Sequence, residues 1–260
     1  MARKPFDLSK ARVLISNDDG IDASGIKVLE KVVRKVAGEV WVMAPETEQS
    51  AVSHSITMRR PLKIKKLSER RYCVDGTPAD SVMMAVRDVM EGNRPDLLLT
   101  GINRGGNLGE DVLYSGTVGA AKEGAMAGIR SIALSQEYKD GNDVHWETSE
   151  HWLERVLLQV LSLDEDPGII LNINFPSVKS AFVTGIEATL QGQRKMGREI
   201  MKETDPRGGH FRWVGANQTE MSEPGTDIDA ISRGAISVTP LSLDITHTGS
   251  LDKLRAKLSD

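Results

Sequence analysis

One segment, residues 12–20, constrains the fold more than any other part of this sequence. It reads Arg-Val-Leu-Ile-Ser-Asn-Asp-Asp-Gly, so an apolar run ends in two adjacent carboxylates and a glycine. Such a run is typical of a buried parallel strand whose carboxyl end opens into a loop, the place where open α/β sheets bind ligands. Because successive strand side chains point to opposite faces, Asp18 and Asp19 can share a ligand only if the chain leaves the strand near Asn17. Gly20 permits that turn.

The two neighbouring aspartates also constrain the chemistry. Two carboxylates about 4 Å apart repel by roughly 4 kcal/mol at an effective dielectric constant near 20, so such a pair needs a cation or a shared proton. A divalent metal ion is the simpler answer, and Asp18 and Asp19 are its first candidate ligands. From this stretch alone the alternative stays open that both residues only cap the following helix and make a turn.

Apolar spacing along the chain predicts the other elements of an α/β fold. Further strands are expected over residues 39–45, 95–100, 130–135, 169–176 and 236–241. Helices are expected over residues 24–36, 78–90 and 152–163, with Thr77 as N-cap and Pro78 at the first helical position of the second. At 260 residues the chain can form one large α/β domain or two small ones.

Other segments read as additions to the sheet. Residues 61–74 predict a hairpin that projects from it. Residues 179–214 carry strand-like pieces at 182–186 and 211–214, which predicts excursions and hairpins from the core, and residues 221–260 have no compact pattern of their own.

Two loops follow predicted strands and carry polar side chains. The loop over residues 46–55 contains Ser50 and His54, and the loop over residues 101–109 contains four glycines together with Asn103 and Asn107. Hard oxygen donors at three strand ends, those of Asp18, Asp19, Ser50 and Asn103, suit Mg²⁺, Mn²⁺ or Ca²⁺ better than zinc. The five histidines are dispersed, which disfavours a zinc hydrolase.

A helix rich in small residues follows the second of these loops. It starts at Ser115-Gly116-Thr117, and small residues at a helix start let backbone N–H groups approach a bound anion, which the helix dipole also favours. We therefore expect a phosphate there. Tight packing of the helix on the sheet is the alternative, and it explains the glycines but not the asparagines. Neither a Walker loop nor a dinucleotide fingerprint is present.

Composition argues against several classes of protein. No run approaches the ~18 apolar residues of a membrane helix, and residues 1–10 lack the apolar region of a signal peptide, so we expect a cytoplasmic protein without a membrane partner. A net charge of −4 with both signs interspersed argues against a nucleic-acid polymer as partner. The single cysteine, Cys73, excludes an internal disulfide and suits a reducing compartment.

Taken together, these motifs make the chain resemble the SurE family, stationary-phase survival proteins that are metal-dependent nucleoside-monophosphate phosphatases. The resemblance covers essentially the whole chain through Asn17-Asp18-Asp19-Gly20, Ala44-Pro45 with Gln49-Ser50, Ser55-Ile56-Thr57, Gly76-Thr77-Pro78-Ala79-Asp80, Gly101-Ile102-Asn103 with Gly105, Tyr114-Ser115-Gly116-Thr117-Val118, Asn172 with Asn174, Asp205-Pro206-Arg207-Gly208, and Ser237-Val238-Thr239-Pro240-Leu241. Two departures stand out. Ala51 occupies a position where many members have glycine, and Arg212 follows Phe211 where the family often has an aromatic pair.

This resemblance implies a fold and an assembly. The fold is a Rossmann-like, mostly parallel sheet flanked by helices, in a single domain of residues 1–260 with its core over roughly 10–176. Roughly residues 177–260 would form β-hairpin excursions and a C-terminal extension exchanged between subunits, giving homodimers or homotetramers. The resemblance also implies one divalent ion per subunit, Mg²⁺ or Mn²⁺, on Asp18, Asp19, Ser50 and Asn103.

The leading hypothesis is a metal-dependent 5′/3′-nucleotidase in which a metal-activated water attacks the phosphorus of a nucleoside 5′- or 3′-monophosphate, with short polyphosphate as a further substrate. The residues expected to hold phosphate oxygens are Asn107, Ser115, Gly116 and Thr117. Asp18 or Asp19 would accept the proton of the water, and His54 would donate a hydrogen bond to the phosphate or leaving group unless it is an incidental loop residue. Direct attack by Asp18 on phosphorus ranks lower. The alternative from another class is a nucleotide-sensing binding protein without turnover.

Overall fold

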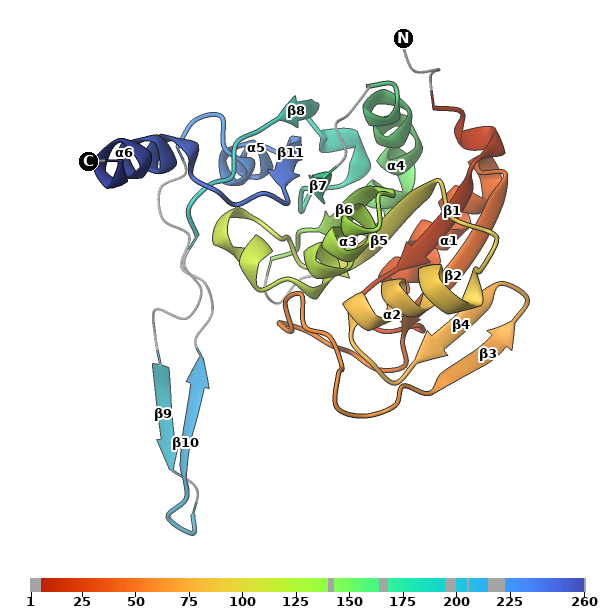
Figure 1. Cartoon of the computed structure of the whole chain (residues 1–260), viewed down its shortest axis with the longest axis horizontal. Helices are drawn as coiled ribbons and strands as arrows, with labels where there is room; N and C mark the ends of the chain where they lie inside the picture. The colour runs from red at the N-terminus through yellow and green to blue at the C-terminus, as the bar shows by residue number, and fades with distance from the viewer. Residues whose placement is uncertain are drawn as a thin grey trace.

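The computed structural model describes residues 6–139, 143–163, 168–194, 200–204, 206–214 and 223–259, and a nine-stranded sheet forms its centre. The strand order is β3-β4-β2-β1-β5-β6-β7-β11-β8 (Figure 1). These strands are β1 (Arg12–Ser16), β2 (Glu39–Pro45), β3 (Ile64–Ser68), β4 (Arg71–Val74), β5 (Leu97–Arg104), β6 (Arg130–Gln136), β7 (Ile169–Phe175), β8 (Ile186–Ala188) and β11 (Ile236–Ser242). The run from β4 to β7 is parallel, whereas β3 and β11 pair antiparallel with β4 and β7. The predicted mostly parallel α/β sheet is confirmed.

Neighbouring parallel strands bring the carboxyl ends of β1, β2 and β5 to one edge of the sheet. Ile15 of β1 pairs with Val42 of β2, and Ser16 pairs with Thr100 of β5. Because β5 continues to Arg104, it carries Asn103 beyond the end of β1. The loops after these strands therefore share the edge at which open α/β sheets bind ligands.

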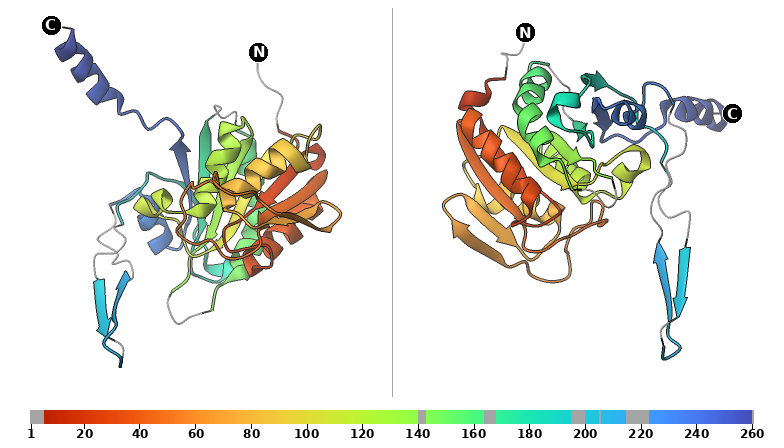
Figure 2. Two further views of the ribbon diagram at one scale, coloured as in Figure 1. Left: turned by 60° about the horizontal axis from the view of Figure 1, so that its bottom comes forward. Right: turned by 180° about the vertical axis from the view of Figure 1, so that it is seen from behind.

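Helices cover both faces of the sheet (Figures 1 and 2). α1 (Ser24–Val36) and α4 (Trp146–Leu161) pack together on one face, and α2 (Pro78–Met84) and α3 (Gly116–Met126) pack together on the other. Successive side chains of β1 point to opposite faces of the sheet and so pack against both helix layers. Val13 and Ile15 join the apolar cluster of α1 and α4, whereas Leu14 joins that of α2. Fully burying one such aliphatic side chain contributes roughly 1.5–3 kcal/mol, so these two clusters hold the helices to the sheet.

The second helix begins as predicted and ends differently. The Thr77 hydroxyl accepts the N–H of Asp80 at 3.1 Å, the Asp80 carboxylate accepts the N–H of Thr77 at 2.9 Å, and Pro78 follows the cap. The chain then changes into a π-helical turn over Ala85–Val89. The helix expected over residues 152–163 starts earlier, because α4 already begins at Trp146 and ends at Leu161.

Three expectations about the added segments are wrong in part. The hairpin of β3 and β4 does not project, because β4 pairs with β2 and extends the main sheet. Residues 182–186 do not form a strand: Ser180–Phe182 is a 3-10 helix, and β8 begins only at Ile186. Residues 223–259 contain α5 (Asp227–Ser232), β11 and α6 (Thr248–Leu258), and β11 lies in the main sheet between β7 and β8, beyond the core boundary expected near residue 176.

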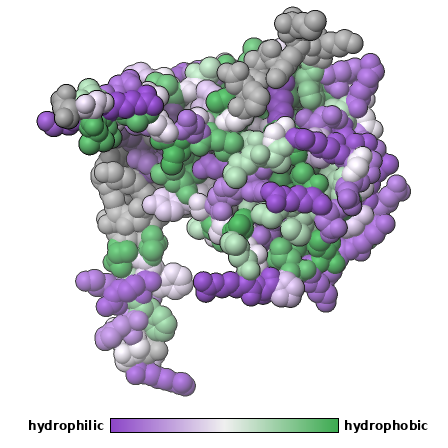
Figure 3. All heavy atoms as spheres, viewed as in Figure 1, coloured by the Kyte–Doolittle hydropathy of each residue, from purple (hydrophilic) through white to green (hydrophobic). Residues whose placement is uncertain are grey.

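A separate hairpin of β9 (Ile200–Thr204) and β10 (His210–Val214) stands away from the body of the protein, as does α6 (Figure 1). This confirms an excursion at residues 211–214. Figure 3 shows hydrophobic residues on the hairpin beside strongly hydrophilic ones. Asp205, which belongs to one of the matched motifs, lies outside the described residues. Among the described helices, none combines the length and apolar character that a membrane span requires.

Gly25, in the first turn of α1, lets this helix pack directly against β5. A Cβ atom built at Gly25 would lie 1.8 Å from the carbonyl oxygen of Ile102. Gly25→Ala should therefore lower the free energy of unfolding by about 2 kcal/mol, because the helix must move away from the strand. Urea unfolding measures this change. Gly185→Ala is the matched control, since a Cβ there meets nothing within 4 Å; equal destabilisation by both variants would contradict the packing argument.

Candidate active site

Loops from three strands meet the start of α3 at the carboxyl edge of the sheet. The carbonyl oxygen of Asp18 accepts the N–H of Gln49 at 2.7 Å, which joins the loop after β1 to the loop after β2. Asp19 Oδ2 accepts the N–H of Arg104 at 3.0 Å, which joins it to the end of β5. Asp18 Oδ1 accepts a hydrogen bond from the hydroxyl of Thr117 in α3. Segments up to 99 positions apart thus form one site.

The turn after β1 has the form that the sequence predicts. β1 ends at Ser16, and the side-chain amide of Asn17 donates to the carbonyl oxygen of Gly20 at 2.8 Å. Gly20 has a φ of +97°, in the left-handed region that favours glycine. The N–H of Ile21 then donates to the carbonyl oxygen of Pro45 at 2.9 Å, so the turn is fixed against β2.

Asp18 is the buried member of the carboxylate pair, with 4% of its surface exposed. Burial raises the pKa of its carboxyl to about 7; the Thr117 hydrogen bond lowers the pKa and the charge of Asp19 raises it. Gly116 makes the close approach possible, since a Cβ there would lie 2.9 Å from Cβ and 3.0 Å from Oδ2 of Asp18. The start of α3 is therefore built around this carboxylate.

Asp19 is less buried than Asp18, and its surroundings also raise the pKa of its carboxyl. Burial is the main cause that raises its pKa, and the nearby carboxylate of Glu48 raises it further, while the N–H and charge of Arg104 lower it. Sequence reasoning missed Glu48, although an acid two residues before a candidate ligand serine is a signal that could have been noticed. The hydroxyl of Ser50 donates to Glu48 Oε1 at 2.8 Å, so Ser50 contacts the acid whose charge acts on Asp19.

Asn103 is positioned by its own loop. Its amide nitrogen donates to the carbonyl oxygen of Gly105 at 2.8 Å, so the amide oxygen is the end that a cation could use. Asn103 immediately precedes Arg104, whose N–H binds Asp19. The loops that carry Asp18, Asp19, Ser50 and Asn103 thus meet at one edge of the sheet, and the binding of one cation by these four side chains stays a prediction.

A divalent cation fits this donor set. The hydrogen bonds to Asp18 and Asp19 come from neutral groups, a hydroxyl and an N–H, while the charges of Glu48 and Arg104 act on Asp19 in opposite directions. Within the described residues, no cluster of three or more histidine, cysteine, aspartate or glutamate side chains is arranged to hold a metal ion. A cation here would therefore combine two carboxylates with the hydroxyl of Ser50 and the amide of Asn103, which are the hard oxygen donors that Mg²⁺ and Mn²⁺ prefer.

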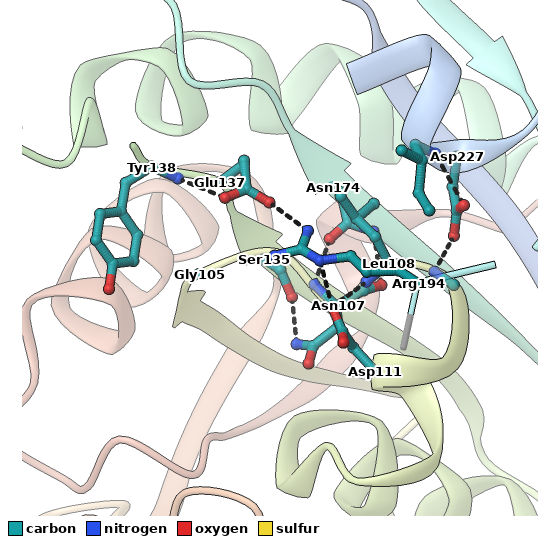
Figure 4. A network of polar contacts seen from close by, with 12 residues as sticks. Gly105, Asn107, Leu108, Asp111, Ser135, Glu137, Tyr138, Asn174, Arg194 and Asp227 are labelled. Atoms are coloured by element: carbon teal, nitrogen blue, oxygen red, sulfur yellow. Dashed lines mark hydrogen bonds and ion pairs between the residues drawn. The ribbon is translucent and has the colours of Figure 1, made fainter. Parts of the chain in front are cut away.

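Asn107 is held by the strands behind the site (Figure 4). Its N–H donates to Asn174 Oδ1 at 2.8 Å, its side-chain amide donates to the hydroxyl of Ser135 at 2.7 Å, and its carbonyl oxygen accepts the amide of Asn172 at 2.8 Å. This network explains the loop asparagine, which tight helix packing could not. A phosphate contact of Asn107 stays a prediction.

The helix start expected to bind phosphate is partly used by the protein itself. The hydroxyl of Ser115 caps α3 by accepting the N–H of Val118 at 3.1 Å, and the hydroxyl of Thr117 serves Asp18. Contacts of Ser115, Gly116 and Thr117 with a phosphate stay predictions, and they would use backbone N–H groups more readily than these two hydroxyls.

His54 has a partner on α3. Its Nε2 lies 3.1 Å from Oε2 of the buried Glu123. The loop that carries it presses on the helix at Gly119, where a Cβ would meet the carbonyl oxygen of Ser53 at 2.4 Å. This contact gives His54 a structural role in docking the loop after β2 on α3, and a catalytic role stays a prediction.

The chain is similar to known proteins over most of its length. The sequence model of the family described as "Survival protein SurE" matches residues 13–198. The chain belongs to the SurE family. It is 56% identical over 249 residues to a "5′-nucleotidase SurE" of Paramagnetospirillum magneticum, covering 95% of this chain and 96% of that protein. It is 46% identical over 252 residues to a "5′-nucleotidase SurE" of Rhodospirillum rubrum, covering 95% of this chain and 96% of the relative. The crystal structure of the SurE protein from Aquifex aeolicus is similar with a TM-score of 0.84 and 38% identity, over 96% of this chain and 100% of that one.

Ala51, one of the two departures from the SurE family pattern, has a φ of +58°. A left-handed conformation costs a residue with a Cβ roughly 1–2 kcal/mol, and the higher unfolded-state entropy of glycine offsets only part of this. Ala51→Gly should therefore raise the free energy of unfolding by about 0.5–1 kcal/mol in a urea titration. Ala37→Gly, at a φ of −94°, is the control and should lower stability. Equal losses in the two variants would contradict backbone strain at Ala51.

The raised pKa of Asp18 predicts a pH dependence of stability in the metal-free protein. Between its ordinary pKa of 3.8 and about 7, the folded state holds a proton that the unfolded state has released, so stability falls as pH rises through this window. Asp18→Asn removes this contribution. In EDTA, its stability relative to the wild type should therefore increase by about 1.4 kcal/mol per pH unit between pH 5 and 6.5. Parallel curves for both proteins would contradict the assignment.

Proposed function

We propose that this chain is a divalent-metal-dependent nucleotidase that hydrolyses nucleoside 5′- and 3′-monophosphates to nucleoside and phosphate. The observation that carries the proposal is the pair Asp18–Asp19 at the carboxyl edge of the sheet, linked to Ser50 and Asn103, in a chain whose closely similar relatives are named 5′-nucleotidases. In the reaction, water adds to phosphorus, the ester bond to the nucleoside oxygen breaks, and that oxygen takes up a proton. Short polyphosphate is a further substrate of the same chemistry.

Asp18, Asp19, Ser50 and Asn103 would hold one Mg²⁺ or Mn²⁺ ion. When bound, such an ion supplies Lewis-acid chemistry, because it neutralises phosphate charge and lowers the pKa of water. The residues of the protein would position the ion and neutralise part of its charge. The Thr117 hydroxyl fixes the orientation of Asp18, and the Arg104 N–H fixes that of Asp19.

The start of α3 supports binding of the phosphate. Its positive dipole end lies beside Asp18, which approaches the backbone at Gly116 and accepts the Thr117 hydroxyl, and such an end favours a bound anion. Proton transfer from the attacking water would go to Asp18 or Asp19, whose pKa values burial raises. His54, paired with Glu123, is the candidate donor to the phosphate or to the leaving oxygen.

We further propose that the chain acts as a cytoplasmic homodimer or homotetramer, with the C-terminal segment exchanged between subunits. Large apolar side chains exposed on the β9–β10 hairpin and on α6 support this, since contiguous apolar surface favours association. They are Ile200, Met201, Phe211, Trp213, Val214, Leu254 and Leu258.

Asp19→Asn tests the proposed chemistry. It removes a candidate ligand from the more open position, so phosphate release from AMP with Mn²⁺ should fall by about 1000-fold, the loss expected when several kcal/mol of transition-state stabilisation disappear. Asp22→Asn changes an exposed aspartate three residues further along and should leave the rate within about twofold.

The wild-type protein supplies the second arm of this test. EDTA should abolish phosphate release, and added Mg²⁺ or Mn²⁺ should restore it. Full turnover in Asp19→Asn would reject the site, and binding of GMP without phosphate release by the wild type would replace the proposal with a nucleotide-sensing function.

A further inference from the structure

Arg104 is an exposed arginine fixed beside the candidate active site. Its N–H donates to Asp19 Oδ2 at 3.0 Å, and it directly follows Asn103. Its guanidinium lies over the ring of Tyr138, with Cζ 4.9 Å from the ring centroid. The backbone of Arg104 therefore belongs to the carboxylate site, while its planar cation extends to an aromatic ring next to that site.

Tyr138 is held in place from the neighbouring strand. Arg104 pairs with Gln136 at the end of β6, and Tyr138 follows two residues later in the loop after that strand. The N–H of Tyr138 donates to Glu137 Oε1 at 3.1 Å, and Glu137 Oε2 lies 3.4 Å from Arg194 Nη1 (Figure 4). The backbone at Tyr138 is therefore fixed by a local hydrogen bond that does not involve Asp18 or Asp19.

Gly105 connects this aromatic ring to the candidate ligand Asn103. A Cβ built at Gly105 would lie 3.6 Å from Cε1 of Tyr138 and 4.0 Å from Nδ2 of Asn103. With a φ of +113°, the residue also adopts a conformation that favours glycine. A side chain at Gly105 would therefore point toward both the ring edge of Tyr138 and the Asn103 amide, and its absence leaves the space between them open.

A nucleoside monophosphate has a phosphate at one end and a flat base one ribose away. Proteins stack bases on aromatic rings and on guanidinium planes, and such stacking tolerates all bases because each has a π face. A guanidinium already lying on an aromatic ring is oriented before the ligand arrives, which reduces the entropy lost on binding.

Resting on the function proposed above, we propose that the Arg104 guanidinium, supported by Tyr138, is the surface on which the nucleobase of the substrate stacks. Arg104 is then a specificity residue that contacts the base, and Tyr138 is a positioning residue that acts through Arg104. The pair selects nucleotides over other phosphate esters without selecting strongly among bases.

The test compares AMP with ribose 5-phosphate, which has the same phosphate and sugar but no base. For Arg104→Ala, kcat/KM for AMP should fall by about tenfold or more relative to kcat/KM for ribose 5-phosphate, mainly through a higher KM, because the base is remote from phosphorus. Loss of the Arg104 charge beside Asp19 affects both substrates alike, so the ratio between them isolates the contact with the base. Tyr138→Ala should give a smaller loss of the same kind, and Tyr138→Phe, which keeps the ring, should behave as the wild type.

Arg155→Ala is the matched control. Arg155 and Trp152 form the same kind of pair on α4, with Cζ of Arg155 5.1 Å from the ring centroid. Its loss should change kcat/KM for neither substrate. Calorimetric titration with AMP and with ribose 5-phosphate measures the same ratio as affinities, independently of turnover. Equal losses for both ligands in Arg104→Ala would overturn the stacking surface, as would a wild type that binds both equally. A wild type that prefers AMP in binding but releases no phosphate from either would refute the nucleotidase function and leave the stacking surface supported.

Discussion

A buried carboxylate at the mouth of the sheet is the constraint around which the site is organised. Asp18 is almost completely buried. An ionised carboxylate in such a position is strongly unfavourable unless it gains hydrogen bonds, a proton or a cation. The hydroxyl of Thr117 supplies one hydrogen bond, and burial raises the pKa of the carboxyl to about 7. A bound divalent ion would balance the negative charge of the ionised carboxylate. The burial of Asp18 and the proposed metal chemistry are therefore connected.

Close approach of backbones makes this burial possible. Gly116 brings the start of α3 against Asp18, Gly119 admits the loop after β2, and Gly25 admits the end of β5 against α1. A Cβ at any of these positions would meet another atom at 3.0 Å or less. The small residues from which an anion site is predicted therefore have a packing role, and the anion site at the start of α3 stays a prediction.

Support from behind the site comes from parts of the chain far along the sequence. Asp227 accepts the N–H of Gly109 at 2.9 Å and that of Gly192 at 2.8 Å, so α5 is tied to the glycine-rich loop. Arg194 lies 3.5 Å from Asp111 and 3.4 Å from Glu137 (Figure 4). Burial and the neighbouring acids raise the pKa of Asp111 to about 6, against the lowering effect of Arg194. The C-terminal region thus stabilises the loop that carries Asn107.

Features with a local cause were predictable from the residues: the strand ending at Ser16, the turn at Asn17 and Gly20, the Thr77 cap, and the paired aspartates at the carboxyl edge of a parallel sheet. The partners that these elements meet depend on the folded arrangement of the whole chain. β4 pairs with β2 and β11 with β7 in the main sheet, and the contacts of Glu123 with His54, of Arg104 with Asp19 and of the Glu48 charge with Asp19 arise only when distant loops pack together. Periodicity and capping depend on residues a few positions apart and can be read from the chain, whereas strand partners and charge clusters depend on contacts between segments that no local pattern specifies.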